Sequence, residues 1–93
     1  MPNKPPSFLG GMGRQERAAS VVLALKSQGN LPEIYVGGER QFLQIARPIL
    51  RNWGVKSDDY GTIWAMIGFA VQQPAAFLRM CEEMDARKRV LAN

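Results

Sequence analysis

The sequence predicts an all-α protein, a small single-domain bundle of four helical segments that follows a flexible N-terminal arm. Its 93 residues suffice for one domain, and 46% of them are hydrophobic, which is typical of globular rather than disordered chains. Apolar residues recur at the three- and four-residue spacing of a helix in several long runs. Glycine, asparagine and proline stand between these runs, where helices begin and end.

Residues 1–13 are predicted to form the flexible arm, and residues 14–93 the helical domain. The arm is rich in residues that disfavour helices, namely Pro2, Pro5, Pro6, Gly10, Gly11 and Gly13. Within it, Phe8-Leu9 forms an apolar pair that could dock on the core or on a partner.

The first helix is predicted from Arg14 to about Gln28. Glu16 stands in its first turn, where the helix dipole favours a negative charge, and Gly29-Asn30 is a signal for its C-terminal end. The apolar residues share one face: Ala18, Val21, Val22 and Leu25.

Residues 31–38, LPEIYVGG, have the least regular pattern. Their centre, residues 34–36, combines β-branched and aromatic side chains and so has strand propensity. Only Phe8-Leu9 could pair with so short a strand. We therefore predict an extended connector, with a short β pairing as the alternative.

A second helix is predicted to begin near Glu39 and to end at Gly54. Its apolar residues converge on one face: Phe42, Ile45, Ala46, Ile49, Leu50 and Trp53. Pro48 lies inside this pattern, where it removes a backbone N–H and disfavours a helical conformation of Arg47. The helix is therefore expected to be kinked or split into two short helices at Pro48.

The third helix is predicted from Ser57, an N-cap residue followed by two aspartates, to about Gln72. Residues 63–71 are apolar on every side, which indicates a central helix covered by the others. Because Trp64 belongs to this stretch, we expect its side chain in the core.

The fourth helix is predicted to begin at Pro74, a residue that suits the first helical position. Its apolar side carries Phe77, Met80, Cys81, Met84 and Leu91. Cys81 is expected to be a buried small hydrophobe, because no imidazole is present to activate its thiol. The cations of residues 87–89, Arg87, Lys88 and Arg89, match the dipole at the end of a helix, with a partner patch as the alternative.

Composition narrows the possible chemistry. Twelve Lys and Arg against eight Asp and Glu give a net charge of +4, a mild basic balance that fits an acidic partner, including nucleic acid. Histidine is absent and cysteine occurs once, so the commonest general base, a zinc ligand set and an internal disulfide are all missing. We expect no catalytic residue, no metal and no cofactor.

A cytoplasmic location without a membrane partner is expected. The first ten residues contain too much proline for the apolar core of a signal peptide. The longest apolar run, residues 63–71, is far shorter than the roughly 20 residues that span a bilayer.

The main candidate for partner binding is a stripe on the second helix, formed by Arg40, Gln44, Arg47 and Arg51. Offsets of seven and eleven residues place the three arginines within about 40° on a helix, opposite its apolar face. The forked guanidinium groups suit phosphates or carboxylates. The alternative is an ordinary solvated face, and a break at Pro48 would disturb the alignment.

A second candidate is an edge of small residues on the third helix, Gly61, Ala65 and Gly68. Glycines inside a helix cost about 1 kcal/mol each relative to alanine, which suggests that close packing requires them. The first or fourth helix of the same chain is the favoured neighbour, and a second subunit is the alternative.

Two further motifs are weak. Residues 50–63 have the spacing of a helix-turn-helix, but Asp58 and Asp59 stand where a recognition helix would meet DNA phosphates. Gly37-Gly38 precedes a helix start, where free N–H groups could hold an anion. The lysine of a phosphate loop is missing and Glu39 would repel the anion, so a hinge is expected instead.

These patterns predict a small non-enzymatic cytoplasmic binding protein, an adaptor, inhibitor or accessory subunit that acts by contact with a protein. The alternative is a nucleic-acid-binding regulator that uses the basic helix face and the arm. An enzyme based on Asp58, Asp59 or Tyr60 is disfavoured, because adjacent carboxylates in a first helical turn match the dipole better than they form an acid–base pair.

Overall fold

The structure is a computed structural model that describes residues 13–29 and 31–92. Within these residues the chain forms α-helices and no strand, so the predicted all-α class is confirmed. The elements are α1 (Arg14–Lys26), α2 (Leu31–Val36), α3 (Gly38–Asn52), the 3-10 turn η1 (Ser57–Asp59), α4 (Tyr60–Gln72) and α5 (Pro74–Ala92). The predicted arm, with Phe8-Leu9, lies outside the described residues except for Gly13.

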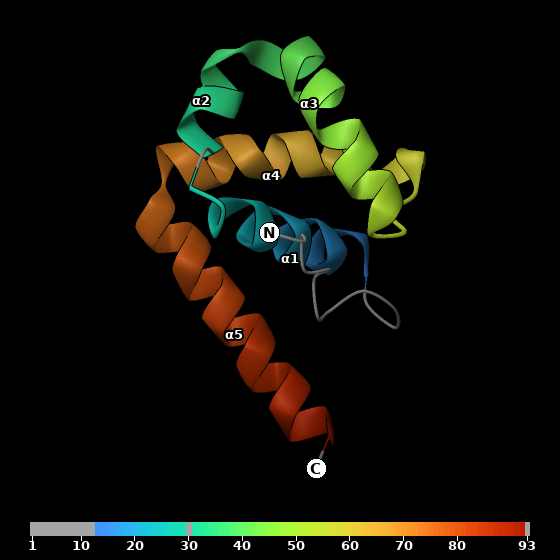
Figure 1. Cartoon of the computed structure of the whole chain (residues 1–93). Helices are drawn as coiled ribbons and strands as arrows, with labels where there is room; N and C mark the ends of the chain where they lie inside the picture. Colours follow the sequence, from blue (N-terminus) through green and yellow to red (C-terminus); the bar gives the residue numbers. More distant parts are fainter. Residues whose placement is uncertain (1–12, 30, 93) are drawn as a thin grey trace.

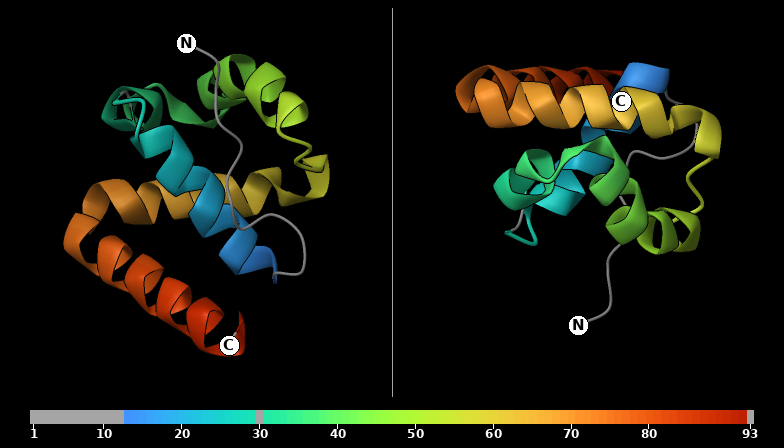
Figure 2. Two further views of the ribbon diagram at one scale, coloured as in Figure 1. Left: turned by 60° about the horizontal axis from the view of Figure 1, so that its bottom comes forward. Right: turned by 90° about the horizontal axis from the view of Figure 1, so that it is seen from above.

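Helix α4 lies at the centre of the fold, as residues 63–71 predicted, and packs against α1, α2 and α5. Helices α2 and α3 lie on one side of α4, and α5 leads away on the other side (Figure 1). The right-hand view of Figure 2 shows the same arrangement from above, with α4 and α5 in one layer and α2 and α3 in another. Among the described residues, no helix combines the length and the apolarity needed to cross a bilayer.

One apolar cluster, to which all five α-helices contribute, forms the core. Its largest fully buried side chains are Phe42, Phe77, Leu25, Leu50, Ile63, Ile67, Val21 and Val22. Cys81 is buried as predicted, and this burial raises the pKa of its thiol. The helical apolar patterns therefore select most of the core, because burying apolar area is the main favourable term in folding.

Trp64 and Ile45 depart from the predicted burial. Trp64 is only half-buried: its ring stacks on Tyr35, with centroids 5.6 Å apart, and lies 5.5 Å from the ring of Phe42. Ile45 remains 44% exposed. A domain of this size has a thin core, so it cannot cover every side of helices that are apolar over wide arcs.

Residues 31–36 form helix α2, so the predicted extended connector is wrong. Pro32 stands in the first turn, where its missing N–H leaves no helical hydrogen bond unmade. Leu31 and Ile34, three residues apart, are both buried, and Tyr35 packs on Trp64. A lone strand would leave backbone groups unpaired, whereas a helical turn pairs them within the segment. Burial of apolar side chains and pairing of backbone groups within the helix therefore outweigh the strand propensity of residues 34–36.

Helix α3 is continuous from Gly38 to Asn52 with Pro48 inside it, so the split into two helices is wrong. Pro48 cannot donate a hydrogen bond to the carbonyl of Gln44. Because Pro48 is exposed, water can solvate that carbonyl instead. Glycines with positive φ stand at both ends of the helix, with φ of 90° at Gly38 and 78° at Gly54. These positions agree with the predicted start near Glu39 and the predicted end at Gly54.

The ends of the other helices fall close to their predicted positions. Helix α1 stops at Lys26, just before Gly29, whose φ of 85° requires a glycine. Residues 57–59 form a 3-10 turn rather than the first α-helical turn, and α4 begins at Tyr60. Helix α5 begins at Pro74 as predicted.

Candidate functional site

The exposed face of α3 carries the predicted basic stripe on one uninterrupted helix. Its residues, Arg40, Gln44, Arg47 and Arg51, are all exposed. Because α3 continues through Pro48, the alignment of the three arginines within about 40° is retained. The helix therefore positions the stripe through its backbone alone, and the opposite face anchors it in the core.

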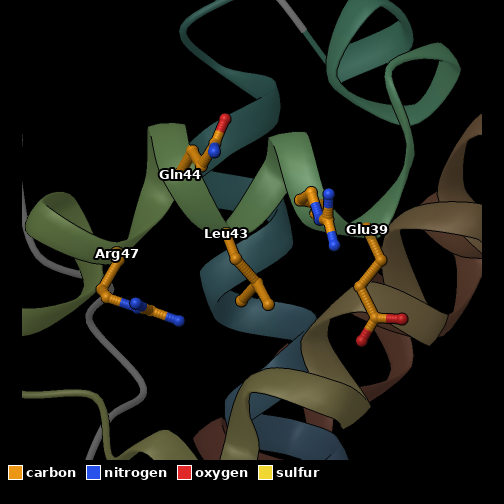
Figure 3. A pocket seen from close by; sticks show the side chains of 5 residues that line it. Glu39, Leu43, Gln44 and Arg47 are labelled. Atoms are coloured by element: carbon orange, nitrogen blue, oxygen red, sulfur yellow. The ribbon is translucent and has the colours of Figure 1, made fainter.

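A shallow hollow of about 540 Å³ lies along this face, lined by Glu39, Arg40, Leu43, Gln44 and Arg47. Figure 3 shows Glu39 and Arg47 on either side of Leu43, with Gln44 pointing the other way. Leu43 is half-buried and packs against the core, so the hollow has an apolar floor and a polar rim.

The hollow brings together only part of the predicted stripe. Arg40, Gln44 and Arg47 line it, whereas Arg51 stands one turn beyond. Sequence analysis missed Glu39 and Leu43 as members of this site. Leu43 flanks the apolar face in the helical pattern, and that position was the available signal.

The three arginines of the stripe make no ion pair with any described residue. Arg14 and Arg17 of α1, by contrast, form ion pairs with Asp59. The guanidinium donors on α3 are therefore left to water or to a partner. Of the described residues that line the hollow, Glu39 alone carries a negative charge.

Asp59 takes part in a partly buried ion pair that the sequence did not predict. Arg17 donates through Nε to Oδ2 at 2.9 Å and through Nη2 to Oδ1 at 3.2 Å, and Arg14 Nε lies 3.3 Å from Oδ1. The hydrogen bond from Arg17 lowers the pKa of Asp59 most, opposed by burial and aided by the charges of Arg17, Arg14 and Lys56. The carboxylate therefore ties α1 to the start of α4.

The edge of small residues on α4 is largely uncovered. Gly61 and Ala65 are exposed, and the nearest neighbour of a Cβ at Gly68 would be Cε1 of Tyr35, at 3.2 Å. The favoured neighbours, the first and last helices, do not pack on this edge, so that expectation is wrong. Gly68 instead allows the close approach of a side chain from α2.

A second, smaller hollow of about 370 Å³ lies beside this edge, lined by Tyr35, Trp64, Ala65, Gly68, Phe69, Gln72 and Gln73. The amide of Gln72 donates to the hydroxyl of Tyr35 at 2.5 Å. None of these lining residues is charged. The hollow on α3 is thus the larger of the two and has the stronger electrostatic character.

The structure also places the three weaker candidates, which are Gly37-Gly38, the helix-turn-helix-like residues 50–63 and the cations of residues 87–89. Gly37 alone links α2 to α3, whose first residue is Gly38. Helix α4, the would-be recognition helix, is packed against three other helices and has no basic residue, which disfavours the helix-turn-helix interpretation. Arg87 is exposed, and the side chains of Lys88 and Arg89 lie outside the described part.

Comparisons of this chain with protein-family models, with curated proteins and with solved structures find no match.

Proposed function

We propose that this chain is a non-enzymatic protein-binding module, an adaptor, inhibitor or accessory subunit, and that it binds its partner through the exposed face of α3. One observation carries the proposal. Arg40, Arg47 and Arg51 are exposed and aligned on one continuous helix, without an ion pair to any described residue.

The composition of the hollow favours a protein over a nucleic acid. Protein interfaces are enriched in arginine and have an apolar centre within a polar rim, which matches Leu43 between Arg40 and Arg47. A phosphate backbone would offer no apolar counterpart to Leu43 and would be repelled by Glu39. A non-catalytic role is supported by the described lining residues, which include no nucleophile and offer Glu39 as their one carboxylate.

The decisive test is a charge reversal of the stripe. The variant Arg40→Glu, Arg47→Glu, Arg51→Glu should keep the circular dichroism spectrum of the wild type, because all three side chains are exposed. It should lose the proteins that the wild-type chain captures from nuclease-treated native lysate. The matched comparison is between two double variants: Arg79→Glu, Arg87→Glu reverses two exposed charges outside α3 and should retain the captured proteins, whereas Arg40→Glu, Arg47→Glu changes the net charge equally and should lose them.

Two results would contradict the proposal. If the stripe variant captures the same proteins as the wild type, the α3 face is an ordinary solvated surface. If nuclease removes the captured material, the chain binds nucleic acid, and its affinity should then fall with salt at a log–log slope of about −0.9 per phosphate contacted. Lysine in place of the three arginines should retain more binding to phosphate than to carboxylates held by a guanidinium fork.

A further inference from the structure

We infer that the partner element received by α3 is an acidic amphipathic helix that runs antiparallel to α3, an inference that rests on the proposed function. The occupant is argued from three features of the face: the spacing of its charges, the apolar residue between them and the single carboxylate at one end.

The spacing of the binding residues is that of a helix–helix contact. Arg40, Arg47 and Arg51 are seven and four residues apart, so their attachment points lie about 10 Å and about 6 Å apart along the axis. Leu43 and Gln44 occupy the intervening turn. A partner helix with anchors at i, i+4, i+7 and i+11 has the same rise per residue and the same eleven-residue span, so it can place one side chain opposite each arginine and one opposite the turn between Arg40 and Arg47.

The charge on this face determines the chemistry of the partner. Three guanidinium groups that pair with no carboxylate of the described residues call for carboxylates across the interface. The half-buried Leu43 calls for one aliphatic side chain among those carboxylates, because burying apolar surface there is favourable. The complementary helix is therefore acidic, with an aliphatic residue near its centre.

Glu39 sets the direction. It lies at the N-terminal end of the hollow, and Arg51 lies at the C-terminal end of α3. Helices favour acids near the N-terminus and bases near the C-terminus because of the dipole. An antiparallel partner brings its acidic N-terminal end to Arg51 and a basic C-terminal end to Glu39, whereas a parallel partner reverses both contacts.

The α3 face of a second copy does not meet these requirements. Two α3 faces in contact would bring the three arginines of each copy together against one glutamate from each. Like charges across an interface are repelled, so α3 is unsuited to pairing with itself.

The test uses a fluorescent synthetic helical peptide and the full chain. Counted from its N-terminus, the peptide carries a first glutamate, a second four residues later and a third seven residues after that. A leucine stands three residues after the second glutamate, and one lysine stands near the C-terminus. Fluorescence anisotropy measures the affinity of this peptide for the full chain. The peptide should bind about tenfold more tightly than either of two controls of equal composition, one with the two glutamate intervals exchanged and one with a scrambled sequence.

A charge swap tests the individual contact. Arg47→Glu should weaken binding about tenfold, and a peptide with lysine in place of its second glutamate should restore binding to this variant. The control Arg79→Glu changes an exposed residue of α5 and should alter the affinity for neither the original peptide nor the lysine peptide. Restoration by the matched peptide alone would place that glutamate opposite Arg47.

Each contrary result has its own meaning. Equal binding of the peptide with exchanged intervals overturns the antiparallel direction, and equal binding of the scrambled peptide overturns the helical partner. Tighter binding of an RNA oligonucleotide of equal charge assigns the face to nucleic acid. If no peptide binds while lysate capture still requires the arginines of α3, the inference fails and the proposed function stands. If capture does not require them, the proposed function itself fails.

Discussion

Arg17 and Asp59 are 42 residues apart in sequence, yet two hydrogen bonds join them side by side, Nε to Oδ2 at 2.9 Å and Nη2 to Oδ1 at 3.2 Å. Asp59 is only 5% exposed, so this bidentate pair ties α1 to the turn that precedes α4. Forked arginine–carboxylate pairs are among the stronger polar contacts in proteins, and removal of one partner leaves the other unsatisfied.

Asp59→Asn should therefore lower the free energy of unfolding by about 1–3 kcal/mol, the range for leaving one partner of a buried hydrogen bond unsatisfied. Urea denaturation followed by circular dichroism measures this. The matched control is Asp58→Asn, which removes the same charge from the exposed neighbouring residue and should change stability little. Equal losses in the two variants would show that net charge, rather than the pair, is responsible.

The same pair predicts how stability depends on pH. The folded state holds the pKa of Asp59 below its ordinary value of 3.8. A lowered folded-state pKa contributes stability that is fully present above 3.8 and is lost as pH falls through the lower folded value. The difference in unfolding free energy between wild type and Asp59→Asn should thus be constant near neutral pH and shrink in acid. A difference that grew in acid would contradict the assignment.

Trp64→Ala should destabilise the protein by roughly 2–3 kcal/mol, less than the 3–5 kcal/mol typical of a fully buried aromatic residue. The reason is that Trp64 is only half-buried, although its ring contacts those of Tyr35 and Phe42. Phe42→Ala provides the comparison, because Phe42 is fully buried and should lose more. Denaturant unfolding of the two variants gives the order, and a larger loss at Trp64 would contradict the predicted order.

The two glycines of α4 should respond differently to alanine. At Gly61 a Cβ would meet nothing within 4 Å, so Gly61→Ala should stabilise the helix by up to about 1 kcal/mol. At Gly68 the Cβ would press on Tyr35, so Gly68→Ala should gain less or destabilise. Thermal unfolding of both variants tests this, and an equal gain at both sites would mean that Tyr35 moves aside freely.

Pro48→Ala should stabilise the protein by roughly 1–3 kcal/mol, since proline in a helix interior costs about 3 kcal/mol relative to alanine. Part of this gain is offset because alanine makes the unfolded chain less restricted. Pro32→Ala is the control: Pro32 stands in the first turn of α2, where proline is favourable, and its replacement should give no gain. The midpoints of urea denaturation of the two variants, each compared with the wild type, measure these changes. A midpoint that does not rise in Pro48→Ala would contradict the prediction.

The sequence by itself determined the all-α class and the bounds of most helices. Apolar residues at helical spacing, the N-terminal Pro74 and the positive-φ positions Gly29 and Gly54 carry that information locally. The alignment of Arg40, Arg47 and Arg51 was equally predictable, because it follows from the pitch of one helix. Local patterns suffice where the cause of a structure lies within a few residues.

Only the tertiary structure decided the features that depend on distant neighbours. Residues 31–36 are helical because Leu31 and Ile34 reach the core and Tyr35 meets Trp64, which their strand propensity could not reveal. Asp59 is buried because Arg17 arrives from α1, and α4 keeps an uncovered edge because the other helices pack elsewhere. The physical reason is that burial and ion pairing depend on which elements meet in space.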